Sequence, residues 1–172
     1  MKTPRQDRGV RPLTDQARGA LFNILAAKVP DAVFLDLFAG TGAVGIEALS
    51  RGAKIAIFVE LKRPVVSLIR QNLELTGFSD RAEVYAVDVI RGLNLLHSKG
   101  AKFDIIFMGA PYDSPVLENA LNKLAETDLL NPDGILIAEH RKQHILGERY
   151  GKLGRLREVR YGETVLSFYG IQ

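Results

Sequence analysis

Five short apolar runs, separated by segments with helical spacing, constrain the fold of this chain more than any other feature of its sequence. The runs are VFLDLF (33–38), IAIFVE (55–60), AEVYAV (82–87), FDIIFM (103–108) and GILIAEH (134–140). Several of these runs are almost continuously apolar, which is typical of strands buried on both faces, and strands that alternate with helices favour a parallel sheet. The sequence therefore predicts an α/β fold with helices on both faces of the sheet.

Helical segments are expected between these runs and before the first of them. Apolar residues from Ala17 to Leu25 recur at helical spacing, and Thr14 is placed to cap that helix. Further helices are expected from the turn after residue 38 to about Arg51, and over residues 64–75, 89–98 and 116–126.

The C-terminal end follows a different pattern. Residues 155–160 and 164–169 are β-rich and are separated only by a three-residue turn around Gly162, which indicates a hairpin. Five parallel strands followed by an antiparallel pair predict a seven-stranded mixed sheet. We expect a single domain over residues 1–172, with a basic arm and first helix over 1–28 and the core over 29–172.

Composition excludes several classes of site. The chain has no cysteine, its three histidines form no spaced metal pattern, and no apolar run is long enough to cross a membrane. We therefore expect no metal, no membrane partner and a cytoplasmic location. The net charge is only +3, but basic residues gather in two groups that would suit phosphates if the fold brought them together, scattered charge being the alternative. They are Lys2, Arg5, Arg8, Arg11 and Arg18, and then Arg141, Lys142, Arg149, Lys152, Arg155, Arg157 and Arg160.

A glycine-rich turn follows the first apolar run. Gly40, Gly42 and Gly45 have G-x-G-x-x-G spacing between a predicted strand and a predicted helix, where a ligand can approach the backbone closely. Glu60 ends the next strand, 20 residues after Gly40, which suits a carboxylate that holds ribose hydroxyls. A dinucleotide and S-adenosylmethionine make the same demand, so these residues leave both ligands open.

Acidic residues near the turn help to separate the two ligands. Asp36 lies four residues before Gly40, where it would repel a pyrophosphate but would suit the ammonium and sulfonium groups of S-adenosylmethionine. Its alternative role is to hold the glycine loop by hydrogen bonds. Asp88 follows the third strand, where it could meet an adenine amino group or cap the helix that begins at Val89. For Glu60, the alternative is a solvated charge.

The fourth strand ends in the loop Gly109-Ala110-Pro111-Tyr112. The carboxyl ends of parallel strands meet at one edge of a sheet, so this loop should lie beside the glycine turn. A Pro-Tyr pair there suits the stacking of a base swung out of a nucleic acid, although an ordinary turn with a packed aromatic is also compatible with it.

Nearly the whole chain resembles the bacterial 16S ribosomal RNA (guanine-N2) methyltransferase D family (RsmD). The resemblance is carried by VRPLTDQARGALFNIL (10–25), FLDLFAGTGAVGIEALSRGA (34–53), FVE (58–60) and the PY of GAPY. It implies a Rossmann-like, class I methyltransferase fold and S-adenosylmethionine as methyl donor. It also implies a guanine of 16S rRNA in the small ribosomal subunit as substrate. We expect the protein to act as a monomer.

The resemblance also implies roles for individual positions. The donor would be bound by Asp36, Phe38, Gly40, Gly42, Glu60 and Asp88. The catalytic loop would consist of Gly109, Ala110, Pro111 and Tyr112, with the last two framing the target base. Arg11, Thr14 and Arg18 would lie by the active site and the RNA.

The catalytic loop departs from the family pattern. The family has Asp-Pro-Pro followed by Tyr or Phe, whereas this chain has Gly109 and Ala110 in the first two places. In the family, the carboxylate accepts a hydrogen bond from the amino group being methylated, which is worth about 1.5–3 kcal/mol, or about 10- to 150-fold in rate. Backbone carbonyls could accept instead. Restoring Asp at position 109 is then expected to raise turnover at least tenfold.

Three alternatives stay open. The first is a catalytically weakened homologue that still binds S-adenosylmethionine and RNA, which Gly109 favours. The second is an NAD-dependent oxidoreductase, which the glycine spacing and Glu60 allow. The third is methylation of a small molecule or a protein.

Overall fold

The structure, a computed structural model, describes residues 13–111 and 114–172. Its helices are α1 (Asp15–Ile24), α2 (Ala43–Ser50), α3 (Arg63–Thr76), α4 (Val89–Ser98) and α5 (Val116–Ala125), with a 3-10 turn, η2, at Ser79–Arg81. Its strands are β1 (Val33–Leu37), β2 (Ile55–Val59), β3 (Ala82–Tyr85), β4 (Phe103–Met108), β5 (Leu130–Arg141), β6 (Arg149–Tyr150), β7 (Leu153–Tyr161) and β8 (Thr164–Ile171). No helix among the described residues is both long and apolar enough to cross a bilayer.

Within the described residues, the strands form one mixed sheet in the order β3-β2-β1-β4-β5-β8-β7-β6. The five strands from β1 to β5 pair in parallel, and β8, β7 and β6 continue the sheet with antiparallel pairings. The predicted α/β class and C-terminal hairpin are confirmed. The predicted number of seven strands is one too low, because β6 is only two residues long and a pair of residues carries no alternating pattern.

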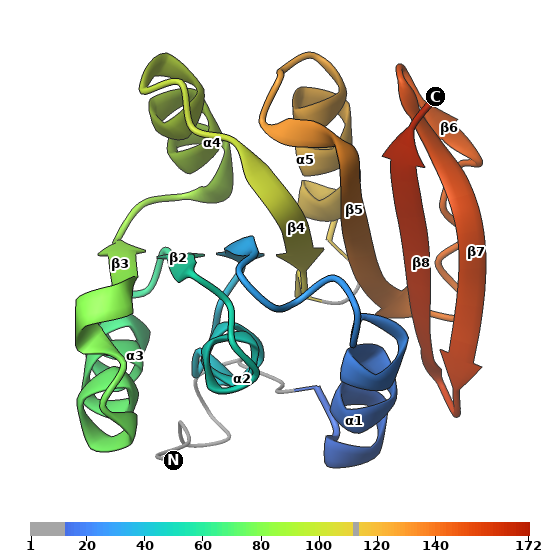
Figure 1. The fold of residues 1–172 in the computed structure, drawn as a ribbon. Helices are drawn as coiled ribbons and strands as arrows, with labels where there is room; N and C mark the ends of the chain where they lie inside the picture. The colour runs from blue at the N-terminus through green and yellow to red at the C-terminus, as the bar shows by residue number, and fades with distance from the viewer. Residues whose placement is uncertain (1–12, 112–113) are drawn as a thin grey trace.

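Helices cover both faces of the sheet, as the apolar runs predicted (Figure 1). Neighbouring residues of one strand belong to different cores: Phe34 and Ile105 pack with α1, α2 and α3, whereas Leu35 and Ile106 pack with α4 and α5. Because successive side chains of a strand point to opposite faces, a run that is apolar throughout supplies both cores at once.

Two side chains start helices as predicted. The Oγ1 atom of Thr14 accepts a hydrogen bond from the Ala17 N–H at 3.2 Å and caps α1. The Oδ1 atom of Asp88 accepts one from the Arg91 N–H at 3.0 Å and caps α4. These hydrogen bonds satisfy N–H groups that have no partner within the first helical turn.

The chain path creates a switch point beside β1. From β1 the chain moves outward through β2 to β3, then crosses back to β4 on the other side of β1. Connections that leave in opposite directions open a crevice beyond the carboxyl ends of the two central strands, and ligands of open α/β sheets bind in such crevices.

Candidate active site

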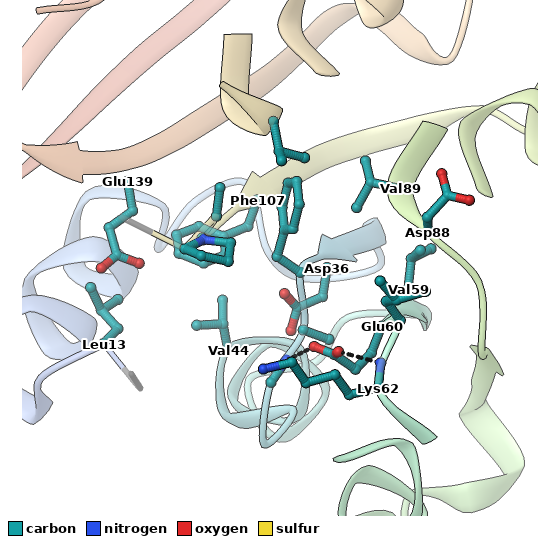
Figure 2. A pocket seen from close by; sticks show the side chains of 18 of the residues that line it. Leu13, Asp36, Val44, Val59, Glu60, Lys62, Asp88, Val89, Phe107 and Glu139 are labelled. Atoms are coloured by element: carbon teal, nitrogen blue, oxygen red, sulfur yellow. Dashed lines mark hydrogen bonds between the residues drawn. The ribbon is translucent and has the colours of Figure 1, made fainter. Parts of the chain in front are cut away.

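A cavity of about 590 Å³ occupies this crevice. Its walls come from the ends of β1, β2, β4 and β5, the loops that follow them, and the first turns of α4 and α5 (Figure 2). The cavity is lined by all but one of the predicted donor-binding positions, namely Asp36, Phe38, Gly40, Glu60 and Asp88. It is also lined by Gly109, Ala110 and Pro111 of the predicted catalytic loop. The fold therefore brings together four segments that are far apart in the sequence.

The glycine turn after β1 needs left-handed backbone at several positions. Gly40 and Gly42 have φ angles of 57° and 82°, and Phe38, which is not a glycine, has a φ of 59°. A bulky residue in this region is strained, and such strain is common beside ligand sites. Gly42 itself does not line the cavity; it precedes the first residue of α2. Gly42 shapes the turn, and its predicted role in donor binding stays a prediction.

The third glycine of the spacing is required by packing. The φ of Gly45 lies outside the left-handed region. A Cβ atom at Gly45 would overlap the ring of Phe58 and lie 3.2 Å from Asp36 Oδ2. The absence of a side chain lets α2 pack directly on β2 and places the Gly45 N–H within reach of Asp36.

Backbone N–H groups of the glycine turn are used inside the protein. The Gly40 N–H donates to Glu60 Oε1 at 3.1 Å, and the Gly45 N–H donates to Asp36 Oδ2 at 3.0 Å. The Gly42 N–H donates to the Ala39 carbonyl at 2.9 Å. A turn that binds a pyrophosphate offers such N–H groups to the phosphate oxygens. Here carboxylates have taken two of them, which makes this side of the cavity anionic.

Asp36 is buried, with only 1% of its surface exposed. Burial raises the pKa of Asp36 well above its ordinary value, the Gly45 hydrogen bond opposes that rise, and the negative charges of Glu60 and Glu139 add to it. Asp36 has the structural role weighed for it, since it holds the start of α2. It also lines the cavity, where its contact with the donor stays a prediction. A cation bound nearby would lower the pKa of Asp36 again.

The carboxylate of Glu60 links the glycine turn to the residues that follow β2. Its Oε2 atom accepts a hydrogen bond from the Lys62 N–H at 2.8 Å, while Oε1 accepts the Gly40 N–H (Figure 2). The alternative of a merely solvated charge is wrong, because both carboxylate oxygens are anchored. Each oxygen can accept more than one hydrogen bond, so the group remains able to bind ligand hydroxyls.

The predicted catalytic loop lies at the end of β4. Ala110 is buried, Pro111 is exposed, and both line the cavity with Gly109. Tyr112 lies outside the described residues, so its predicted stacking role stays a prediction.

Thr14 and Arg18, the two predicted RNA-contacting residues that the structure describes, do not line the cavity. Arg18 forms ion pairs with Asp15 at 3.0 Å and with Glu47 of α2 at 3.6 Å, and Thr14 caps α1. Arg11 lies outside the described residues. These contacts give Arg18 and Thr14 structural roles, while the neighbouring Leu13 reaches the cavity instead.

The C-terminal basic group does not form one cationic surface. Ion pairs join its members to carboxylates: Lys142 to Glu163 at 2.9 Å, Lys152 to Asp128 at 3.1 Å and Arg155 to Glu158 at 2.9 Å. The strand register also separates Arg160, which lies level with His140 near the carboxyl end of β5, from Arg149 at the opposite end of the sheet. Scattered charge describes these residues better than a joint phosphate site.

At the end of β5, sequence reasoning missed Glu139 and placed Arg141 only in the C-terminal basic group. Glu139 and Arg141 line the cavity, and Glu139 is only 7% exposed. The signal was present, because a fifth parallel strand must bring its carboxyl end to the same edge as the other four. Asn119 of α5 and Lys62 also line the cavity and were not singled out.

Comparison with known proteins places the chain in a family. A family model described as "Conserved hypothetical protein 95" matches residues 1–170. The chain belongs to this family. The Bacillus subtilis (strain 168) protein named "Putative rRNA methyltransferase YlbH" is 35% identical over 159 residues, which is 92% of this chain and 86% of that protein. The Escherichia coli (strain K12) protein named "Ribosomal RNA small subunit methyltransferase D" is 35% identical over 131 residues, or 76% of this chain and 64% of that protein.

The fold of this chain agrees with that of a solved structure of similar sequence. The structure called "Putative methyltransferase yhhF from Escherichia coli" superposes with a TM-score of 0.84 at 31% identity and covers 100% of this chain and 91% of that one. The predicted Rossmann-like methyltransferase fold is thereby confirmed. The cavity at the carboxyl edge is the candidate active site of this family member.

Proposed function

We propose that this chain transfers a methyl group from S-adenosylmethionine to ribosomal RNA, and that its substrate is the exocyclic amino group (N2) of a guanine in 16S rRNA. The names of the relatives support the reaction class and the small-subunit RNA. The guanine N2 rests on the motif resemblance in residues 10–25 and 34–53. We further propose that the protein works in the cytoplasm as a monomer.

The observation that carries the proposal is that carboxylates accept the hydrogen bonds of two N–H groups at the glycine turn. Glu60 and Asp36 accept them, so a diphosphate in the turn would meet carboxylates in place of donors. S-adenosylmethionine carries no phosphate and two cationic groups, and it fits a wall with Asp36, Glu60 and Asp88. The same contacts argue against NAD.

Individual residues divide the work of binding. Glu60 is placed to accept hydrogen bonds from the ribose hydroxyls while its turn contacts persist. Asp88 caps α4 through Oδ1, which leaves Oδ2 as an acceptor for the adenine amino group. Gly40 lets the amino-acid portion approach the backbone, beside the carboxyl group of Asp36.

The chemistry needs little beyond positioning. S-adenosylmethionine supplies, when bound, the methyl group and the positively charged sulfur that releases it. Phe107 and Pro111 line the cavity with Gly109, where a flipped base would contact them. Holding two reactants in line contributes up to about 7–11 kcal/mol to lowering the barrier.

Two measurements test the proposal. Calorimetry should show binding of S-adenosylhomocysteine and no comparable binding of NAD. A tritium-transfer assay on small ribosomal subunits from cells that lack the protein should label 16S rRNA, and mass mapping should place the methyl group on a guanine N2. Tight NAD binding without S-adenosylhomocysteine binding would contradict the cofactor, and label in a protein or a small molecule would contradict the substrate.

A second candidate function is a homologue that binds donor and RNA but methylates poorly. The observation that favours it is the loop itself, since Gly109 and Ala110 bring no side-chain carboxylate to the end of β4. In that case S-adenosylhomocysteine binds normally while tritium transfer stays near background.

A further inference from the structure

The space beside Gly109 is already occupied by a carboxylate. Strands β4 and β5 pair in parallel with Met108 opposite Ala138, so the next residues along the two strands are Gly109 and Glu139. A Cβ atom built on Gly109 would lie 3.0 Å from Glu139 Oε2 and 3.1 Å from the Phe107 ring. The Glu139 side chain therefore reaches the place where an aspartate at position 109 would begin.

This proximity leaves little room for a side chain at position 109. The φ of Gly109 lies outside the left-handed region, so its backbone conformation is one that any residue can adopt. A side chain at position 109 would instead be crowded by Glu139 and Phe107, which would have to shift by a few tenths of an ångström. The glycine and the glutamate thus form one arrangement, in which a neighbouring strand delivers the carboxylate that the loop lacks.

Glu139 also lies on the side of the cavity that remains for the base. Figure 2 shows it beside Leu13, on the opposite side of the cavity from Glu60 and Asp88. The donor-binding residues Glu60 and Asp88 belong to the β2 and β3 side, which leaves the β4 and β5 side for the base. The negative charge of Glu139 acts on Asp36, as the raised pKa of Asp36 reflects, so the two carboxyl groups share one cavity.

We propose that Glu139 is the catalytic residue that accepts a hydrogen bond from the amino group being methylated, in place of the missing aspartate at position 109. The inference rests on the proposed function, since it needs an amino group as methyl acceptor. A buried carboxylate is a strong acceptor, and its hydrogen bond fixes the nitrogen with its lone pair toward the methyl carbon.

The step balances with Glu139 as the proton acceptor. The amino nitrogen forms a bond to the methyl carbon with its lone pair, while the carbon–sulfur bond breaks and its electron pair stays on sulfur. The nitrogen then carries the positive charge, which the Glu139 carboxylate stabilises. One N–H proton passes to Glu139 and from there to water, which restores the carboxylate.

The first test compares wild type with Glu139→Gln, which keeps the shape and removes the charge. We expect kcat for methyl transfer to small subunits to fall at least tenfold, with S-adenosylhomocysteine affinity within threefold of wild type. The exposed Glu74→Gln on α3 is the matched control and should behave as wild type. A kcat for Glu139→Gln within threefold of wild type overturns the inference.

The second test moves the carboxylate back to position 109. The sequence alone predicts that Gly109→Asp raises turnover at least tenfold. With Glu139 in that space, Gly109→Asp alone should instead give no gain, and a tenfold gain would overturn the inference. In a Glu139→Ala background, where Glu139 no longer crowds position 109, Gly109→Asp should raise kcat at least tenfold above that of Glu139→Ala alone, and Gly109→Ala should not. Equal kcat values for these two double variants would also overturn it.

A third test needs no methyl donor. Once the methylated guanine is mapped, RNA fragments that carry guanosine or inosine at that position differ only by the amino group. Wild type should bind the guanosine fragment more tightly, and Glu139→Gln should lose that preference; equal binding of both fragments by wild type contradicts the inference. Failure of wild type to bind S-adenosylhomocysteine or to label any rRNA would instead remove the proposed function itself.

Discussion

The buried carboxylate of Asp36 accepts a hydrogen bond from the Gly45 N–H, 3.0 Å away, across the floor of the candidate active site. One contact thus joins the end of β1 to the first turn of α2 and sets an ionisable group beneath the cavity. We expect the buried carboxylate of Asp36 to lower the stability of the fold and to strengthen ligand binding, a trade-off that is common at functional sites.

Asp36→Asn is expected to raise stability and weaken donor binding. Burial raises the pKa of Asp36, so the folded state binds the proton more readily than the unfolded chain does. The destabilisation is therefore absent below the unfolded value near 3.8 and grows as pH rises to the folded pKa. Thermal melts at low and neutral pH should show a gain for Asp36→Asn that is larger at neutral pH. Calorimetry should show at least tenfold weaker S-adenosylhomocysteine binding; unchanged affinity would remove Asp36 from the cofactor site.

Gly45→Ala is expected to destabilise the protein by about 1–3 kcal/mol, because the added methyl group overlaps the Phe58 ring. Gly19→Ala is the matched control, since Gly19 lies inside α1 and a Cβ there meets nothing within 4 Å. That control should gain about 0.5–1 kcal/mol. Urea unfolding of the two variants checks the pair, and a loss of equal size in both would show that packing at Gly45 is not the cause.

Glu60→Gln is expected to weaken donor binding at least tenfold with a smaller loss of stability. The two carboxylate oxygens accept N–H groups from Gly40 and Lys62, whereas an amide would turn its NH₂ group toward one of them. The glycine turn should therefore shift together with the ribose contact. Calorimetry with S-adenosylhomocysteine checks this, and the idea fails if Glu60→Gln binds as tightly as wild type.

Asp88 variants separate capping from ligand contact. Asparagine is as good a helix cap as aspartate, so Asp88→Asn should keep the thermal stability, whereas Asp88→Ala should lose about 1 kcal/mol with the Arg91 N–H contact. If Asp88 also binds the adenine amino group, both variants should bind S-adenosylhomocysteine several-fold more weakly. Affinity that changes only in Asp88→Ala would leave Asp88 a cap alone.

The parts of the site that sequence reasoning located are those governed by local rules. A cap such as Thr14 acts on an N–H three residues away, and a left-handed turn such as that at Gly40 needs a residue type at one position. The buried strands were found because a short, mostly apolar run indicates by its residue types alone that it is buried. Glu60 and Asp88 were found because they stand next to such strands.

The parts that were missed depend on which strands become neighbours. Whether the C-terminal arginines gather or pair with acids depends on the register of β7 against β8, and the two residues of β6 become a strand only through their partners in β7.

By itself, the sequence determined the order of strands and helices, the glycine turn and the acidic residues at the strand ends, since hydrophobic period, capping and glycine spacing act over a few residues. Only the tertiary structure decided that Glu139 fills the space beside Gly109, because that contact follows from the pairing of two strands that lie 30 residues apart along the chain. Local patterns cannot encode such a pairing, which arises when strands register against each other around two shared cores.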